Sequence, residues 1–309
     1  MEKQLQDKAA SNKDLVSNWF MDLQSDIVRQ LEEADGHAVF SVENWSRPGG
    51  GGGITRLMTE GGIIEKGGVN FSAVYGSTPP PIKAAFRTEA DGFFATGVSI
   101  VIHPRNPFVP IIHMNVRYFE LSDGHAWFGG GIDLTPAYVF EEDAVWFHGN
   151  LKSVCDRFDP NYYEQFKRQA DDYFFIPHRN ETRGIGGIFY DRLPADSPAQ
   201  FAHLWDFTRA VGSLFAPVYV HLIHQNRNRN WTEVHKNWQL HRRSRYVEFN
   251  LVYDAGTRFG LETNGRTESI LMSLPPLARW ESNYQPPEGS EESKSQQYFR
   301  KGISWLKTH

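Results

Sequence analysis

The stretch from Ser99 to Asp133 constrains the fold more than any other, because apolar and polar residues alternate on both sides of a proline-containing turn. Successive side chains of a strand point to opposite faces, so this alternation predicts a β-hairpin with two unlike faces. One face would be apolar, with Ile100, Ile102, Met114, Val116 and Tyr118. The other would carry Val101 together with a polar set, namely Ser99, His103, His113, Asn115 and Arg117. Such polar groups need water or hydrogen-bond partners, so we interpret this face as a functional site.

The length and composition are typical of a globular protein with a large core. The chain has 309 residues, of which 40% are apolar and 14% aromatic, which is enough for a single domain over residues 1–309. We expect residues 1–14 to be flexible. The formal net charge is -5, and no block of Lys and Arg stands apart from acidic neighbours. This charge distribution argues against nucleic acid as a partner.

Cysteine usage and hydropathy bear on where the protein works. Cys155 is the only cysteine, so the chain has no internal disulfide and cannot hold an iron–sulfur cluster that needs several thiolates. The N-terminal residues include acidic side chains and no apolar core, unlike a signal or transit peptide. No apolar run approaches the roughly 20 residues of a membrane helix. We therefore expect a cytoplasmic protein without a membrane span.

Helical and strand-like patterns alternate along the rest of the chain. Apolar spacing predicts helices over residues 12–34, 134–158, 161–175, 199–224, 231–242, 267–280 and 291–306. Thr135 is the expected cap of the second helix. Strand-like patterns cover residues 45–75, 99–133, 182–193 and 245–254. Strands joined by short loops, with helices at both ends, predict an α+β fold with a large, mainly antiparallel sheet covered by helices.

Clusters of glycine raise the question of a phosphate-binding loop. Gly49 to Gly53 is not followed by the Lys-Ser/Thr pair of a P-loop, and the segment from Gly184 to Phe189 lacks the third glycine of a dinucleotide fingerprint. We favour the alternative that these glycines supply positive φ angles or let a bulky ligand approach the main chain. The run Gly129 to Gly131, just before Asp133, fits a close approach best.

Several longer motifs carry a resemblance to a known family. They are WFGGGIDLTP, DDYFFIPHRNETRGIGGIFYD and RYVEFNLVYDAGTRFGLETNGRTESILMSLPPLARWE, together with the Ser99 to Arg117 hairpin. With them, the chain from about Asn18 to Trp305 resembles the oxygen-dependent coproporphyrinogen III oxidases of heme biosynthesis. The resemblance implies oxidative decarboxylation of two propionates of coproporphyrinogen III to vinyl groups, giving protoporphyrinogen IX, CO2 and hydrogen peroxide. It also implies a homodimer and helices on both faces of the sheet.

The resemblance assigns roles that the residue chemistry can support. A porphyrinogen presents inward-pointing pyrrole N–H donors and a rim of carboxylates, so its site needs an acceptor anion and peripheral cations. We expect Asp133 to hold the pyrroles, Arg117 to bind a propionate and His113 to exchange a proton. The positions implied to contact substrate are Ser99, Asn115, Val116, Arg117, Asn264, Gly265 and Arg266. Dioxygen is the co-substrate, and no cofactor is expected to be required.

A divalent metal is the open alternative. The histidines that align with proposed metal ligands of bacterial members are His103, His113, His148 and His178. Imidazole suits several transition metals, but these four do not form a compact motif, and the chain has 12 histidines. Two other classes of function stay open at this point. One is a metal-dependent oxygenase or hydrolase that uses these histidines, and the other is a noncatalytic tetrapyrrole-binding protein.

Overall fold

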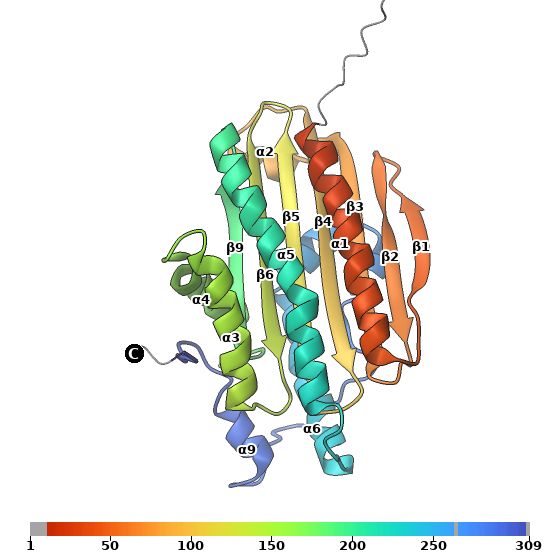
Figure 1. Ribbon diagram of the computed structural model, residues 1–309, viewed down its shortest axis with the longest axis vertical. Coiled ribbons are helices and arrows are strands. Elements are labelled where there is room, and N and C mark those ends of the chain that lie inside the picture. Colours follow the sequence, from red (N-terminus) through yellow and green to blue (C-terminus); the bar gives the residue numbers. More distant parts are fainter. Residues whose placement is uncertain (1–10, 263–264, 307–309) are drawn as a thin grey trace, which may run out of the picture.

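Strands that neighbour one another in the chain also neighbour one another in a single antiparallel sheet. The computed structural model describes residues 11–262 and 265–306. Within them, seven strands form a sheet in the order β1-β2-β3-β4-β5-β6-β9 (Figure 1). These strands are β1 (Ser41–Ser46), β2 (Gly51–Thr59), β3 (Ile64–Ser77), β4 (Gly92–Pro104), β5 (Ile111–Leu121), β6 (Ala126–Thr135) and β9 (Gly186–Pro194). Two short strands, β7 (Phe175–Ile176) and β8 (Glu181–Thr182), pair separately.

Helices lie on both faces of the sheet, as expected. The face turned to the viewer in Figure 1 is covered by α1 (Asn12–Asp35), α3 (Glu141–Asp156), α4 (Tyr162–Tyr173) and α5 (Pro198–Asn226). Behind the sheet lie α6 (Glu233–Val252), α7 (Ala255–Glu262) and α8 (Thr267–Leu271). The remaining helices are α2 (Pro80–Phe86) and α9 (Glu291–Gln296). None of the helices within the described ranges is long and apolar enough to cross a bilayer.

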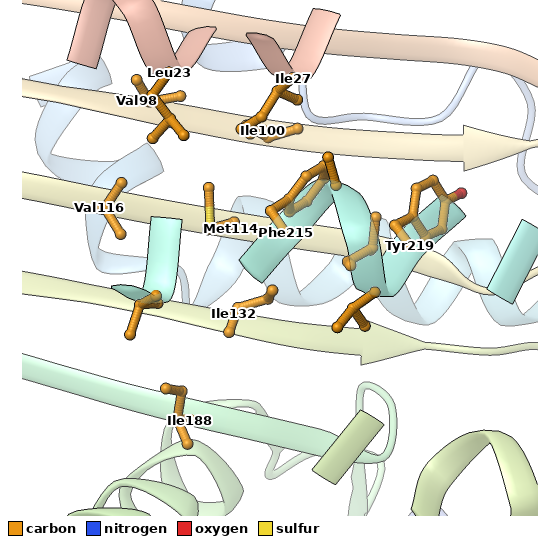
Figure 2. Close-up of a cluster of buried hydrophobic side chains, with 14 of the residues drawn as sticks. Leu23, Ile27, Val98, Ile100, Met114, Val116, Ile132, Ile188, Phe215 and Tyr219 are labelled. Atoms are coloured by element: carbon orange, nitrogen blue, oxygen red, sulfur yellow. The ribbon is translucent and has the colours of Figure 1, made fainter. Parts of the chain in front are cut away.

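The main core lies between the sheet and the helices α1 and α5. Leu23 and Ile27 of α1 contact the sheet over Val98 and Ile100, and Phe215 of α5 packs nearby (Figure 2). Burying side chains of this size contributes about 1.5–3 kcal/mol each. The strands therefore present their apolar residues to this face and leave the alternate residues for the other face.

The predicted hairpin and the residues on its two faces are confirmed. The predicted apolar residues face the core beneath α1 and α5, and each is at most 1% exposed: Ile100, Ile102, Met114, Val116 and Tyr118. On the opposite face, hereafter the polar face, His113 pairs with Asp133 and Asn115 pairs with Gly131. The register of β4 and β5 also places Ser99 opposite Asn115. The strand β6 thus adds its glycines and its carboxylate to the polar face.

The strand predicted at residues 245–254 is wrong, because most of that segment belongs to α6. Its alternation of Val247, Phe249 and Leu251 imitates a strand, yet Leu251 is 45% exposed. The buried residues follow helical spacing instead and include the charged side chains Arg242 and Arg243. A pattern that counts arginine as a solvent-facing residue cannot find a helix that buries its arginines against carboxylates.

Several predicted helix boundaries are also wrong. Thr135 ends β6 and caps no helix, since α3 begins at Glu141 with Phe140 in the capping position. The helix predicted over 267–280 stops at Leu271, before two prolines that disfavour helical backbone in the preceding residue. The one predicted over 291–306 is helical only to Gln296.

Candidate active site

Three side chains form a buried chain of hydrogen bonds at the edge of the polar face. Nδ1 of His113 lies 2.7 Å from Oδ1 of Asp133, and a terminal nitrogen of Arg183 donates to Oδ2 of Asp133 over 2.6 Å. The side chains of Asp133 and Arg183 are each 2% exposed, whereas that of His113 is 21% exposed. His113 is therefore the member of this chain that solvent or a ligand can reach.

Asp133 is held as a carboxylate despite its burial. Burial raises the pKa of Asp133, but the charge of Arg183 and the hydrogen bonds from His113 and Arg183 outweigh it and place the pKa below its ordinary value. The two oxygens of Asp133 already have partners, so the predicted role as a direct anchor for pyrrole N–H groups would use the remaining lone pairs. An ionised Asp133 orients the imidazole of His113 in this arrangement.

Arg183 was missed by the sequence reasoning. It precedes Gly184 in the TRGIGG motif, and its guanidinium lies 4.4 Å from the ring centroids of both Phe174 and Tyr246. It also donates to Oδ1 of Asn250 over 2.8 Å. No local pattern marks a buried arginine whose partners come from β6 and α6. The sequence marks this motif by its strand-like pattern and its glycines, and neither feature points to Arg183.

Around Arg117 the polar face consists of small residues, namely Ser99, Gly129 and Gly131. This area is hereafter called the floor. Arg117 donates to Oδ1 of Asn115 over 2.6 Å and to Oδ1 of Asp191 over 2.7 Å. Its side chain is 36% exposed. A Cβ atom at Gly129 would lie 2.8 Å from the carboxylate of Asp191 and 3.0 Å from Nε of Arg117. Glycine at this position leaves room for the ion pair and for main-chain contact with a ligand.

A second guanidinium stands across the floor from Arg117. Arg266 donates to Oγ1 of Thr55 over 3.3 Å and to Oγ of Ser269 over 2.9 Å. Thr55 and Asn115 are separated by three inter-strand steps, which amounts to roughly 14 Å at the spacing of neighbouring strands. Arg117 is ion-paired with Asp191 and Arg266 with Glu43, and each guanidinium has further N–H groups with which it can bind a carboxylate of one large ligand.

The other predicted contact residues differ in their access to the floor. Ser99 is half-buried on the polar face. The side chain of Val116 is fully buried on the face covered by α1 and α5, so only its main chain can touch a ligand on the floor. Gly265 donates its N–H to the carbonyl of Gly260 over 2.8 Å, close to Arg266. Asn264 lies outside the described residues.

Aromatic rings stand at two edges of the floor. Phe119 and Trp127 stack at one end with ring centroids 4.4 Å apart. At the β9 edge, Phe189 stacks on Tyr173 at 4.1 Å. A large cavity, about 550 Å³, lies elsewhere, near Glu120 at the far end of β5. The candidate site is therefore chosen by the chemistry of its side chains and not by the size of a cavity.

The structure does not bring the four candidate metal ligands together. His148 lies on α3, on the opposite side of the sheet from His113, and its two ring nitrogens contact Tyr163 Oη and the carbonyl of Ile185. Burial lowers the pKa of His148 to about 3.

The other two histidines have partners of their own. His103 contacts the carbonyl of Ser273 over 2.8 Å, and His178 contacts Tyr253 and Glu248. Over residues 11–262 and 265–306, no group of three or more His, Cys, Asp or Glu side chains is placed to hold a metal ion. The residues present in the described ranges do not fit a resident metal.

Comparisons with known proteins cover nearly the whole chain. The sequence model of a family described as Coproporphyrinogen III oxidase matches residues 15–305. Two curated proteins named oxygen-dependent coproporphyrinogen-III oxidase come from the RSA 493 / Nine Mile phase I and Dugway 5J108-111 strains of Coxiella burnetii. Each is 47% identical to the chain over 297 residues, which span 94% of this chain and 95% of the relative.

Proposed function

Because the chain belongs to the coproporphyrinogen III oxidase family, we propose that it is an oxygen-dependent oxidative decarboxylase of coproporphyrinogen III in heme biosynthesis. The observation that carries the proposal is the composition of the polar face. A buried, ionised Asp133 supports a reachable His113, and Arg117 and Arg266 flank a floor of small residues. This set matches a substrate with a broad face, N–H groups and peripheral carboxylates.

The substrate supplies the electrons for the reaction. Each propionate loses CO2 while O2 is reduced to hydrogen peroxide, so R-CH2-CH2-COOH and O2 give R-CH=CH2, CO2 and H2O2. We propose that the pyrrole loses its N–H proton and adds O2 at a ring carbon, which gives a peroxide anion. The peroxide then takes a proton from the side-chain carbon next to the ring, and the electrons of that C–H bond pass into the ring and expel hydroperoxide. The C–CO2 bond breaks as CO2 leaves, and its electrons form the vinyl double bond and restore the pyrrole. The protons released from the pyrrole N–H and from the carboxyl group return to the ring nitrogen and to the hydroperoxide, which leaves as hydrogen peroxide.

Residues of the polar face have distinct parts in this proposal. Arg117 binds a propionate with charge-assisted hydrogen bonds, each worth about 1.5–3 kcal/mol. His113 moves the proton, because Nδ1 faces the carboxylate of Asp133 and Nε2 is left for exchange. Asp133 fixes the orientation of His113, and Arg183 keeps Asp133 ionised.

Turnover of coproporphyrinogen III under air and under argon tests the proposal. We expect vinyl porphyrin, read by fluorescence after oxidation of the products, only where oxygen is present, with one O2 consumed for each CO2 released. A noncatalytic carrier would bind the tetrapyrrole and consume no oxygen. The proposal also includes activity without a metal cofactor. Activity that disappears on exhaustive chelation and returns with a divalent ion would instead favour a metal-dependent oxygenase.

We also propose that the protein forms a homodimer and is located in the cytoplasm. Exposed apolar side chains on and after α6 and α7 support a homodimer, and they include Leu251, Val252, Leu261, Leu277 and Trp280. The mass in solution, measured by light scattering, tests this dimer against a monomer. A cytoplasmic location accords with the single thiol of Cys155, which is buried and has its pKa raised to about 12 by that burial.

A further inference from the structure

Asn250 lies at a junction between the two halves of the candidate active site. It belongs to α6 and its side chain is 4% exposed. Its Oδ1 atom accepts a hydrogen bond from Arg183 over 2.8 Å. Its Nδ2 atom lies 3.1 Å from Oγ of Ser273. The side chain thus contacts the guanidinium behind Asp133 on one side and the segment after α8 on the other.

The segment after α8 is tied to the residues that hold Arg266. Arg266 precedes α8 directly, and Ser269 within α8 accepts a hydrogen bond from it. Ser273 is fixed from the sheet as well, because its carbonyl lies 2.8 Å from Nε2 of His103. A continuous path of hydrogen bonds therefore runs from His113 through Asp133, Arg183 and Asn250 to Ser273.

Only an amide side chain of this length can both accept a hydrogen bond from Arg183 and donate one to Ser273 from position 250. Arg183 can only donate, so its partner atom must accept, and an amide provides a carbonyl oxygen for it. The same amide presents an NH2 group to the hydroxyl of Ser273. Aspartate in its place would keep the shape but would put a second carboxylate against Arg183. That carboxylate would compete with Asp133 for the guanidinium.

We propose that Asn250 is a positioning residue for the reaction, which holds Arg183 against Asp133 and ties this pair to the α8 segment that carries Arg266. The inference rests on the proposed function. It goes beyond it by naming the side chain that couples the proton-moving residues to the carboxylate-binding ones. Arg183 then stays aligned with Asp133 only when the α8 segment is in place.

The test uses Asn250→Asp in the full-length chain, with Asn237→Asp as the control. Asn237 is also an amide of α6 whose Oδ1 accepts from an arginine, Arg279 at 2.9 Å, and that arginine already has a carboxylate partner in Glu281. Asn237 is exposed and does not contact Arg183. We expect Asn250→Asp to lower kcat roughly 10- to 100-fold, the loss expected for a misplaced charge-assisted contact. Asn237→Asp should keep kcat near the wild-type value.

A second readout needs no turnover. Nitrogen NMR of the guanidinium groups in the free protein should show shifted Arg183 signals in Asn250→Asp and unchanged ones in Asn237→Asp. Shifted Arg183 signals with normal kcat would overturn the positioning role, as would unchanged signals. A wild-type chain that never consumes oxygen would instead refute the proposed function, whatever the NMR signals do.

Variants at Ser273 cover the case in which Asn250→Asp does not fold. Ser273→Ala removes the hydroxyl that faces Asn250, and Ser273→Thr retains it. We expect the alanine variant to lower kcat and raise KM together, because it releases both the amide and the α8 segment. The threonine variant should restore both values. Equal kinetics for the two variants would overturn the coupling.

Discussion

Nδ1 of His113 and Oδ1 of Asp133 lie 2.7 Å apart, directly opposite each other on neighbouring strands β5 and β6. Because the carboxylate can only accept, Nδ1 must donate and the neutral ring carries its proton there. The arrangement leaves Nε2 as the basic nitrogen. The antiparallel register therefore fixes both the position and the tautomer of the residue that we expect to move a proton.

The pairing of Asp133 with Arg183 predicts a strong dependence of stability on both side chains. Removing one partner of a buried pair typically costs about 3–5 kcal/mol, since the other charge stays buried without compensation. We expect Asp133→Asn and Arg183→Met each to lower the free energy of unfolding by this amount, measured in urea. The double variant should lose much less than the sum of the two. Additive losses would show that the two charges do not depend on each other.

Arg117 should matter for substrate binding and little for stability. Its side chain is 36% exposed, and exposed ion pairs contribute about 0–1 kcal/mol to folding. We expect Arg117→Ala to raise KM for coproporphyrinogen III roughly 10- to 100-fold while thermal unfolding changes little. Arg209→Ala removes a comparable surface pair with Asp206 on α5 and is the control. The same change of KM in both variants would remove Arg117 from the site.

The burial of His148 predicts a specific dependence of stability on pH. Its pKa is lowered to about 3, whereas an unfolded histidine titrates near 6.5. Between these values the unfolded chain binds the extra proton, so the stability that neutral His148 provides is present above about pH 6.5 and is lost as the pH falls.

Urea unfolding between pH 6 and pH 4 measures this effect. His148→Gln should reduce the slope of unfolding free energy against pH by up to about 1.4 kcal/mol per pH unit. His224→Gln, at an exposed position of α5, controls for the loss of an imidazole. A slope in His148→Gln that matches the wild-type slope would mean that His148 is not buried as a neutral ring.

The sequence predicts the polar face well because the information is local. The alternation around Ser99, His113 and Asn115 has period two, and a single hairpin register brings these residues together. Arg183 and Asn250 could not be predicted in this way. Arg183 meets Asp133 from 50 residues away, and Asn250 meets Arg183 from 67 residues away. The first contact depends on the pairing of β6 with β9, and the second on the packing of α6 behind the sheet.

The incorrect prediction of a strand at residues 245–254, which belong mostly to α6, has a related physical cause. Arg243 is fully buried there because Glu65 of β3 accepts its charge, and such compensation is invisible in a hydropathy pattern. The positions of the candidate metal ligands could not be predicted for a similar reason. The sequence cannot show that α3 places His148 on the opposite side of the sheet from His113.

Turnover of His113→Gln tests the central claim most directly, because glutamine can still donate to Asp133 and the fold should persist. His125→Gln is the matched control, since His125 also faces an aspartate, Asp196 at 3.6 Å, but near the turn between β5 and β6. We predict that CO2 release from coproporphyrinogen III falls about 10²- to 10⁴-fold in His113→Gln and stays normal in His125→Gln. Normal CO2 release by a folded His113→Gln would contradict the account.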